Sequence, residues 1–177
     1  MTKHTDIGLT VLGIDGALNN FGVAHGLVYN NKVIINEIHV LSSKSKKQNK
    51  IFNDAKRARQ IALFLRQFNY DLVVAEIPYG TKSYSAAWSL GITLGLTASV
   101  NTPIIYVTPT EVKRVVRNGA TKREIIDWAY AKHPNLQWYK PTKSAPPIVR
   151  NEHMADAIAV IYAYATKNLK HSFEGSI

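Results

Sequence analysis

Three carboxylates stand within or at the end of apolar runs, where burying an ionised side chain is costly. Asp15 closes the run VLGID, Glu76 closes LVVAE, and Asp156 lies inside MADAIAVIYAYA. A buried acid is tolerated only when it is paired, hydrogen-bonded or bound to a metal ion. Three such positions in one short chain predict a divalent-cation site, provided that the fold brings the acids together.

The length and charge of the chain narrow the class of protein. A chain of 177 residues suits one domain with one core, so we expect residues 1–177 to form a single domain. Its 22 Lys and Arg against 12 Asp and Glu give a net charge of +10. Such an excess favours a polyanionic partner, with nucleic acid first. A charge that only keeps the protein soluble is the other explanation.

The chain has no cysteine, which excludes disulfides, thiolate zinc sites and thiol nucleophiles. Its N-terminus, MTKHTDIG, lacks the apolar core of a signal peptide. The apolar stretch LGITLGLTASV falls short of the roughly 20 residues that a bilayer span needs. We therefore expect a soluble, cytoplasmic protein with no membrane partner.

The order of apolar runs and turns predicts an α/β fold with a five-stranded mixed sheet. Three antiparallel hairpin strands open the chain, and two further strands follow among helices that flank the sheet. The predicted strands are Leu9–Ile14, Phe21–Val28, Val33–Val40, Leu72–Ala75 and Pro103–Val107. The predicted helices are Ile51–Phe68, Tyr84–Val100, a short one ending near Val116, Lys122–Lys132 and Glu152–Asn168.

Two helices carry unusual faces. In the first, the pattern predicts one face of Ala55, Ala58, Ala62 and Leu65, with the basic residues, Arg57 among them, displayed elsewhere. In the second, small residues recur every fourth position at Ala87, Gly91, Gly95 and Ser99. Such a stripe lets another backbone approach closely, either within the domain or across a dimer contact.

The acids and one histidine form a candidate metal site. Asp15 and Glu76 converge if their strands are neighbours, and Asp156 can join them from a helix lying across the sheet. His153 is three residues before Asp156, so both project from one helical face. Three oxygens and one imidazole suit Mg²⁺ or Mn²⁺, whose natural chemistry here is phosphodiester hydrolysis. The alternatives are a turn residue at Asp15, an ion pair at Glu76, a core bridge at Asp156 and an ordinary, partly buried histidine.

Five segments in order carry a resemblance to a known family. They are GIDGALNNFGVA, VVAEIPYG, SLGITLGLTASV, IIYVTPTEVKRVVRNGATKREII and EHMADAIAV. This set resembles the RuvC family of Holliday-junction resolvases over nearly the whole chain. The resemblance implies an RNase H-like fold and a homodimer that cuts four-way DNA junctions symmetrically with Mg²⁺ or Mn²⁺.

The resemblance also implies residue roles. Asp15, Glu76 and Asp156 match the family's acidic metal ligands, and His153 falls where members carry Asp or His. Lys113 and Lys122 match lysines that contact DNA or stabilise charge. Tyr79 matches an aromatic that stacks on a base, and the alternative is an aromatic packed beside the active-site loop. Further DNA contacts are expected from basic residues that could equally be solvated surface: Lys44, Lys46, Lys47, Lys82, Arg114, Arg117 and Arg123.

Two departures from the family leave the substrate open. Gly16-Ala17 stands in place of the usual Pro-Gly, and the segment Pro134–Arg150 is longer than in bacterial members. That segment is either an added DNA contact or an exposed loop with incidental aromatics. The substrate can therefore extend from four-way junctions to other branched DNA.

Two other functions compete with a nuclease. A non-catalytic module for branched DNA would keep the fold and the basic surface without a working site. A small actin-like ATP-binding enzyme would use Asp15–Gly22 as a phosphate loop, but that architecture needs two such domains.

Overall fold

The computed structural model describes residues 8–30, 32–43, 49–81 and 83–174, with only the backbone for 168–174. Five strands form one mixed sheet in the order β3-β2-β1-β4-β5. The strands are β1 (Leu9–Ala17), β2 (Asn20–Tyr29), β3 (Lys32–Ser42), β4 (Leu72–Glu76) and β5 (Ile104–Val107). β1, β2 and β3 are antiparallel neighbours, whereas β4 pairs parallel with both β1 and β5. The predicted five-stranded mixed sheet is confirmed.

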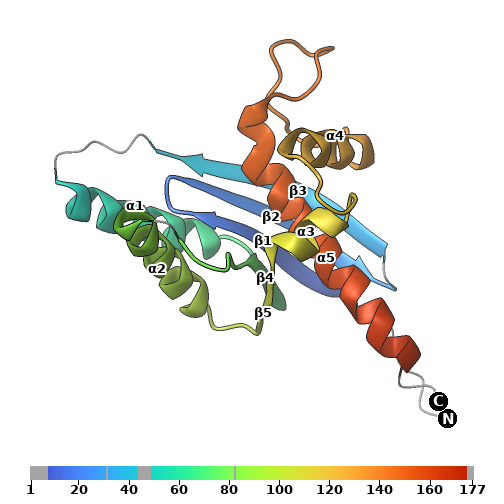
Figure 1. Ribbon diagram of the computed structural model, residues 1–177, viewed down its shortest axis with the longest axis horizontal. Helices are drawn as coiled ribbons and strands as arrows, with labels where there is room; N and C mark the ends of the chain where they lie inside the picture. The colour runs from blue at the N-terminus through green and yellow to red at the C-terminus, as the bar shows by residue number, and fades with distance from the viewer. Residues whose placement is uncertain (1–7, 31, 44–48, 82, 175–177) are drawn as a thin grey trace.

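Helices cover both faces of this sheet. They are α1 (Lys50–Leu65), α2 (Tyr84–Ala98), α3 (Pro109–Arg114), α4 (Lys122–Lys132) and α5 (Glu152–Glu174), with a 3₁₀ turn, η1 (Val149–Asn151), before α5. Figure 1 shows α5 crossing the sheet diagonally with α3 and α4 beside it, while α1 and α2 lie together away from α5. Within the described residues, no helix is long and apolar enough to cross a membrane.

Apolar side chains alternate between the two faces of the sheet and form a hydrophobic core on each face. Val11 and Val74 pack with α3, α4 and α5 on one face. Leu12 and Val73 pack on the opposite face with Ile61 of α1 and neighbouring residues of α2. Because side chains of a strand alternate between faces, Asp15 shares the face of Val11, and Glu76 shares that of Val74. Both acids therefore project toward α5.

Two glycines allow α5 to lie directly on the sheet. A Cβ atom on Gly13 would overlap the carbonyl oxygen of Ala157, and one on Gly22 would overlap that of His153. Gly22 is also the partner of Asp15 in the β1–β2 ladder. Because Gly22 has no side chain, the backbone of His153 can lie next to the β1–β2 strand pair, which includes Asp15.

The predicted face of α1 is wrong in part, because Leu65 is buried as expected but Ala55 is exposed. The buried residues are Asp54, Arg57, Ile61 and Leu65. Arg57 donates from Nε to the carbonyl of Leu18 at 3.2 Å and also binds the carbonyl of Leu41. These carbonyls lie at the β1–β2 turn and near the end of β3. The helix α1 therefore turns Arg57 toward the sheet, where its guanidinium group supplies the hydrogen-bond donors that the carbonyls need.

Replacing Gly22 with Ala should destabilise the protein, because the new methyl group meets backbone rather than a flexible side chain. Overpacking of this kind costs about 1–3 kcal/mol in the free energy of unfolding. Gly80→Ala is the matched control, since a Cβ there has no atom within 4 Å. Urea unfolding of both variants measures the difference. Equal stabilities would contradict the close approach of α5 to β2.

Candidate active site

Asp15 and Glu76 lie side by side at the ends of two neighbouring strands. The parallel register pairs Ile14 with Ala75, and each acid is the next residue in its strand. Both carboxylates therefore lie at one edge of the sheet, on the face that α5 covers.

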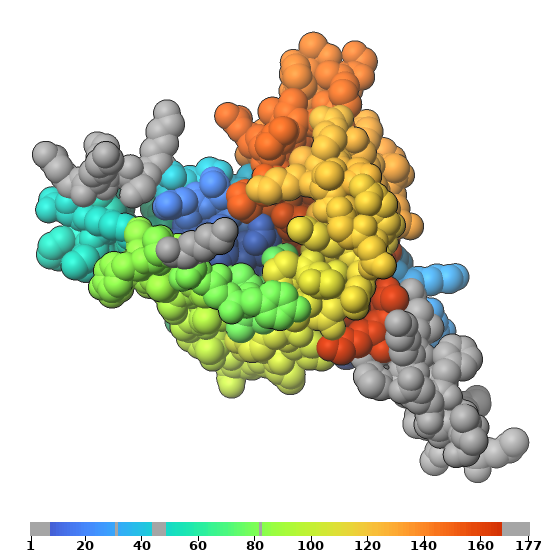
Figure 2. Space-filling view, in the orientation of Figure 1, coloured from blue at the N-terminus to red at the C-terminus, as the bar shows by residue number. Residues whose placement is uncertain are grey.

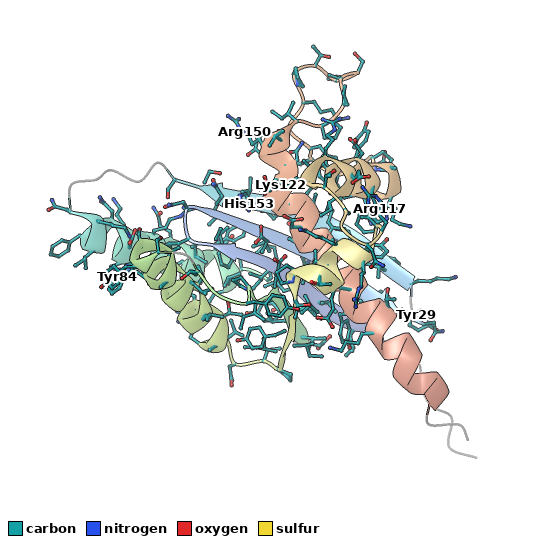
Figure 3. All side chains as sticks on the ribbon, in the orientation of Figure 1. Tyr29, Tyr84, Arg117, Lys122, Arg150 and His153 are labelled. Carbon is teal, nitrogen blue, oxygen red and sulfur yellow. The ribbon has the colours of Figure 1, made fainter. Side chains whose placement is uncertain are left out.

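α5 adds a histidine and a third acid. Nδ1 of His153 donates a hydrogen bond to Oδ2 of Asp15 at 2.6 Å. Asp156 is one helical turn further along, partly buried, and follows the fully buried Ala155. Figure 3 shows His153 at the start of α5, above the strands that carry the other two acids. The fold thus brings together Asp15, Glu76, His153 and Asp156 from three separate elements.

The carboxylates influence one another electrostatically. Burial raises the pKa of Glu76 to about 7, and the Asp15 carboxylate adds to this rise while Lys113 opposes it. Burial also raises the pKa of Asp156 to about 8, with contributions from Asp15, Glu76 and Glu152 that His153 partly offsets. Burial is thus the main cause of both shifts, and the proximity of the carboxylates to one another adds to it.

His153 offsets part of this charge. Its hydrogen bond to Asp15 raises the pKa of the imidazole above its ordinary value, and burial opposes that rise. Within the described residues, no group of three or more His, Asp or Glu side chains is gathered at metal-binding distances. The four residues nevertheless supply the carboxylate oxygens and imidazole nitrogen that Mg²⁺ or Mn²⁺ accepts as ligands.

Two lysines flank the acids. Thr121 and Glu124 form the predicted capping box, which begins α4 at Lys122. Lys122 forms an ion pair with Glu152, and its pKa is raised chiefly by this contact and further by Asp156 and Asp15. Lys113 of α3 is near enough to Glu76 to lower the pKa of that acid.

The sequence reasoning missed the part that Glu152 plays. We interpreted it only as a helix-start residue, yet it ties Lys122 to the first turn of α5. The position of Glu152 next to His153 was the available signal in the sequence. Its partner, Lys122, is thirty positions earlier in the chain, so the sequence does not indicate the pair. Only the packing of α4 against α5 reveals the pair.

The other predicted DNA contacts are unevenly placed. Tyr79 is 80% exposed in the segment after β4, and Arg114 is exposed at the end of α3. Arg117 is held by Glu124 at 2.6 Å, and Arg123 by Asp127 at 2.9 Å. Exposed ion pairs of this kind are weak, so both arginines can exchange a carboxylate for a phosphate. Lys44, Lys46, Lys47 and Lys82 lie outside the described residues.

One face of the molecule is hollowed over the β1–β2 segment. Figure 2 shows the blue β1–β2 segment at the floor of a depression. Its borders are the green segment that leads from β4 into α2, the yellow α3 region and the orange loop before α5. An extended polymer can therefore reach the strand ends from solvent.

No protein-family model and no curated protein matches the chain. Solved structures do match. Thermus thermophilus RuvC in complex with a Holliday junction substrate aligns with a TM-score of 0.67 and 21% identity, over 90% of this chain and 94% of that one. The fowlpox virus resolvase in complex with Holliday junction DNA aligns with a TM-score of 0.61 and 20% identity, over 90% and 99% of the two chains.

These likenesses establish the fold. The chain has the RNase H-like architecture of RuvC, as the motif resemblance implied, and the alignments extend over nearly all of both chains. About one aligned residue in five is identical to its counterpart in these structures. At that identity, the alignments show a shared arrangement of sheet and helices.

Removing the charge of Asp156 should stabilise the protein in a pH-dependent way. An acid whose pKa is higher in the folded state than in the unfolded chain destabilises the fold increasingly as pH rises from about 4 to 8. Asp156→Asn should therefore raise the free energy of unfolding by roughly 2–4 kcal/mol near pH 8 and change it little near pH 4. Urea unfolding without divalent ions measures this. The same effect at both pH values would contradict the crowding of the acids.

Proposed function

We propose that this protein is a divalent-metal-dependent endonuclease that resolves Holliday junctions and also cuts other branched DNA. The observation that supports this most strongly is the convergence of Asp15, Glu76 and Asp156, with His153, on one hollowed edge of an RNase H-like sheet. The solved relatives with bound junction DNA and the net charge of +10 point to the same substrate class.

In this proposal Asp15, Glu76, Asp156 and His153 hold Mg²⁺ or Mn²⁺. A divalent ion polarises a phosphoryl oxygen and lowers the pKa of a bound water. Asp15, Glu76 and Asp156 would supply carboxylate oxygens to the ion, and His153 would supply an imidazole nitrogen.

The neighbouring cations hold the DNA in this proposal. Lys113 and Lys122 stand beside the acids and stabilise negative charge that develops on the scissile phosphate. Glu152 positions the Lys122 ammonium group through their ion pair. The exposed ring of Tyr79, three residues beyond Glu76, stacks on a base that is unpaired at the branch.

We also propose a homodimer that uses the outer face of α2. This helix contains no charged residue, yet Ala87, Gly91, Gly95 and Ser99 are all exposed. Among the described residues, a Cβ on Gly91 or Gly95 would have no atom within 4 Å, so the described part of the fold does not pack against this stripe. A two-fold contact through α2 would pair two active sites, as symmetric cleavage of two strands requires.

Asp15→Asn and Glu76→Gln should abolish cleavage of a four-way junction while leaving its binding within a few-fold of the parent. The matched control is Glu37→Gln, an exposed acid on β3 that should cut normally. Labelled four-way, three-way, flap and duplex substrates, each tested with Mg²⁺ and with Mn²⁺, measure both activity and selectivity. Full cleavage by either acid variant would remove that residue from the site.

The same substrates distinguish the nuclease from a non-catalytic module. If the parent binds branched DNA but leaves no nick with either metal, the module is the better description. If it binds no branched DNA at all, both functions are wrong.

Gly95→Glu should convert the dimer to a monomer without unfolding it, because the new carboxylate enters open space on the isolated chain. Ala131→Glu, on the exposed face of α4, is the matched control. Sedimentation velocity at micromolar concentration measures the state, and circular dichroism checks the fold. A parent that sediments as a monomer with and without junction DNA would overturn the proposed interface.

A further inference from the structure

The segment between α4 and α5, residues 134–150, is held in place by a buried aromatic side chain and by specific contacts to α4 and to the residue that follows it. Trp138 is buried, and its Nε1 donates to the carbonyl of His133 at 2.8 Å. Lys140 extends over the Tyr130 ring, 4.6 Å from its centroid, and donates to the phenol oxygen at 3.0 Å. Arg123 donates to the carbonyl of Pro147 at 3.1 Å. An exposed loop with incidental aromatics does not describe a segment held in this way.

One side chain ties this segment to the start of α5. Asn151 is completely buried, and its Oδ1 accepts from the backbone N–H of Tyr139 at 2.9 Å. Its Nδ2 donates to the carbonyl of the same residue at 2.8 Å. Asn151 is two residues before His153, so the position of Tyr139 is fixed relative to the candidate metal ligands. A buried amide with both groups paired holds a backbone segment firmly.

The outer surface of the segment carries an aromatic ring and a cation stacked together. Tyr139 is 43% exposed, and the guanidinium carbon of Arg150 lies 5.3 Å from the centroid of its ring. Among the described residues, Arg150 forms no ion pair with a carboxylate. Figure 3 shows Arg150 at the same end of α5 as His153 and Lys122. An unneutralised guanidinium on an exposed ring is a surface that suits a phosphate and a base.

We propose that Tyr139 and Arg150 bind an unpaired nucleotide at the branch point, beside the phosphate that the active site cuts. Arg150 contacts the phosphate of this nucleotide through its N–H groups, and its base stacks on the Tyr139–Arg150 pair. Fully paired duplex offers no base for this stack. The pair therefore contributes to selection of branched over continuous DNA, and this inference rests on the proposed nuclease function.

The test measures equilibrium binding in Ca²⁺ and cleavage in Mn²⁺. The probes are a three-way junction with two unpaired adenines at its centre, the same junction fully paired, and a linear duplex. The variants are Tyr139→Ala, Tyr139→Phe and Arg150→Gln, each checked for an unchanged unfolding transition. Lys32→Gln is the matched control for a lost charge, since Lys32 is exposed and pairs with Tyr29 in the β2–β3 hairpin. Figure 3 shows Tyr29 well away from Arg150.

Tyr139→Ala should weaken binding of the junction with unpaired adenines about tenfold, leave the duplex unchanged and be rescued by Tyr139→Phe. Arg150→Gln should weaken binding of the same junction by a similar factor. It should also reduce the salt dependence of binding by about the amount that one phosphate contact contributes. Lys32→Gln should change affinity less than twofold.

Different failures have different meanings. If the parent cuts the junction but both variants bind it as tightly as the parent, this inference is wrong and the nuclease stands. If the variants bind duplex and junction more weakly than the parent by the same factor, the ligand of the Tyr139–Arg150 pair is not an unpaired nucleotide. If the parent neither binds nor cuts any branched probe, the proposed function fails and this inference fails with it.

Discussion

Close packing of α5 on glycine positions of β1 and β2 is the contact on which the candidate site depends. Gly13 and Gly22 remove the side chains that would hold the helix away, so the first turns of α5 lie directly on the strands. That contact places a histidine and an acid from the end of the chain against two acids from the sheet. Burial under the helix, with the neighbouring carboxylates adding to its effect, raises the pKa values of Glu76 and Asp156 to about 7 and about 8. The packing of apolar neighbours therefore stabilises a group of side chains that would otherwise repel one another.

The rest of the structure extends this arrangement outward. α3 and α4 bring lysines to the border of the acids, and Glu152 fixes one of them through an ion pair. The segment before α5 adds Tyr139 and Arg150, and the buried Asn151 ties this segment to the start of α5. On the other side of the sheet, α2 leaves an uncharged stripe uncovered. One sheet and the helices that cover it thus position the acids, the flanking lysines, the Tyr139–Arg150 pair and the α2 stripe.

Local patterns predicted the sheet well, because apolar runs are signals within short windows, and they also singled out the acids. Apolar runs gave the five strands, and an acid at the end of VLGID or LVVAE is conspicuous wherever it occurs. The burial of Arg57 could not be predicted, since its acceptors at Leu18 and Leu41 belong to other elements. The same holds for the Lys122–Glu152 pair and for the Asn151 amide that orders residues 134–150. The stripe on α2 was recognised from spacing, but only the structure showed that no neighbour within the fold covers it. The roles of the site residues stay predictions.

Carboxyl titration by carbon-13 NMR, with and without Mg²⁺, tests the central claim most directly. The account predicts that Glu76 and Asp156 titrate in coupled steps near 7 and 8 without the ion. Saturating Mg²⁺ should lower both midpoints by more than one pH unit, because a bound cation favours the ionised acids. Midpoints near 4 for both acids, unchanged by Mg²⁺, would contradict a crowded, cation-binding group of carboxylates.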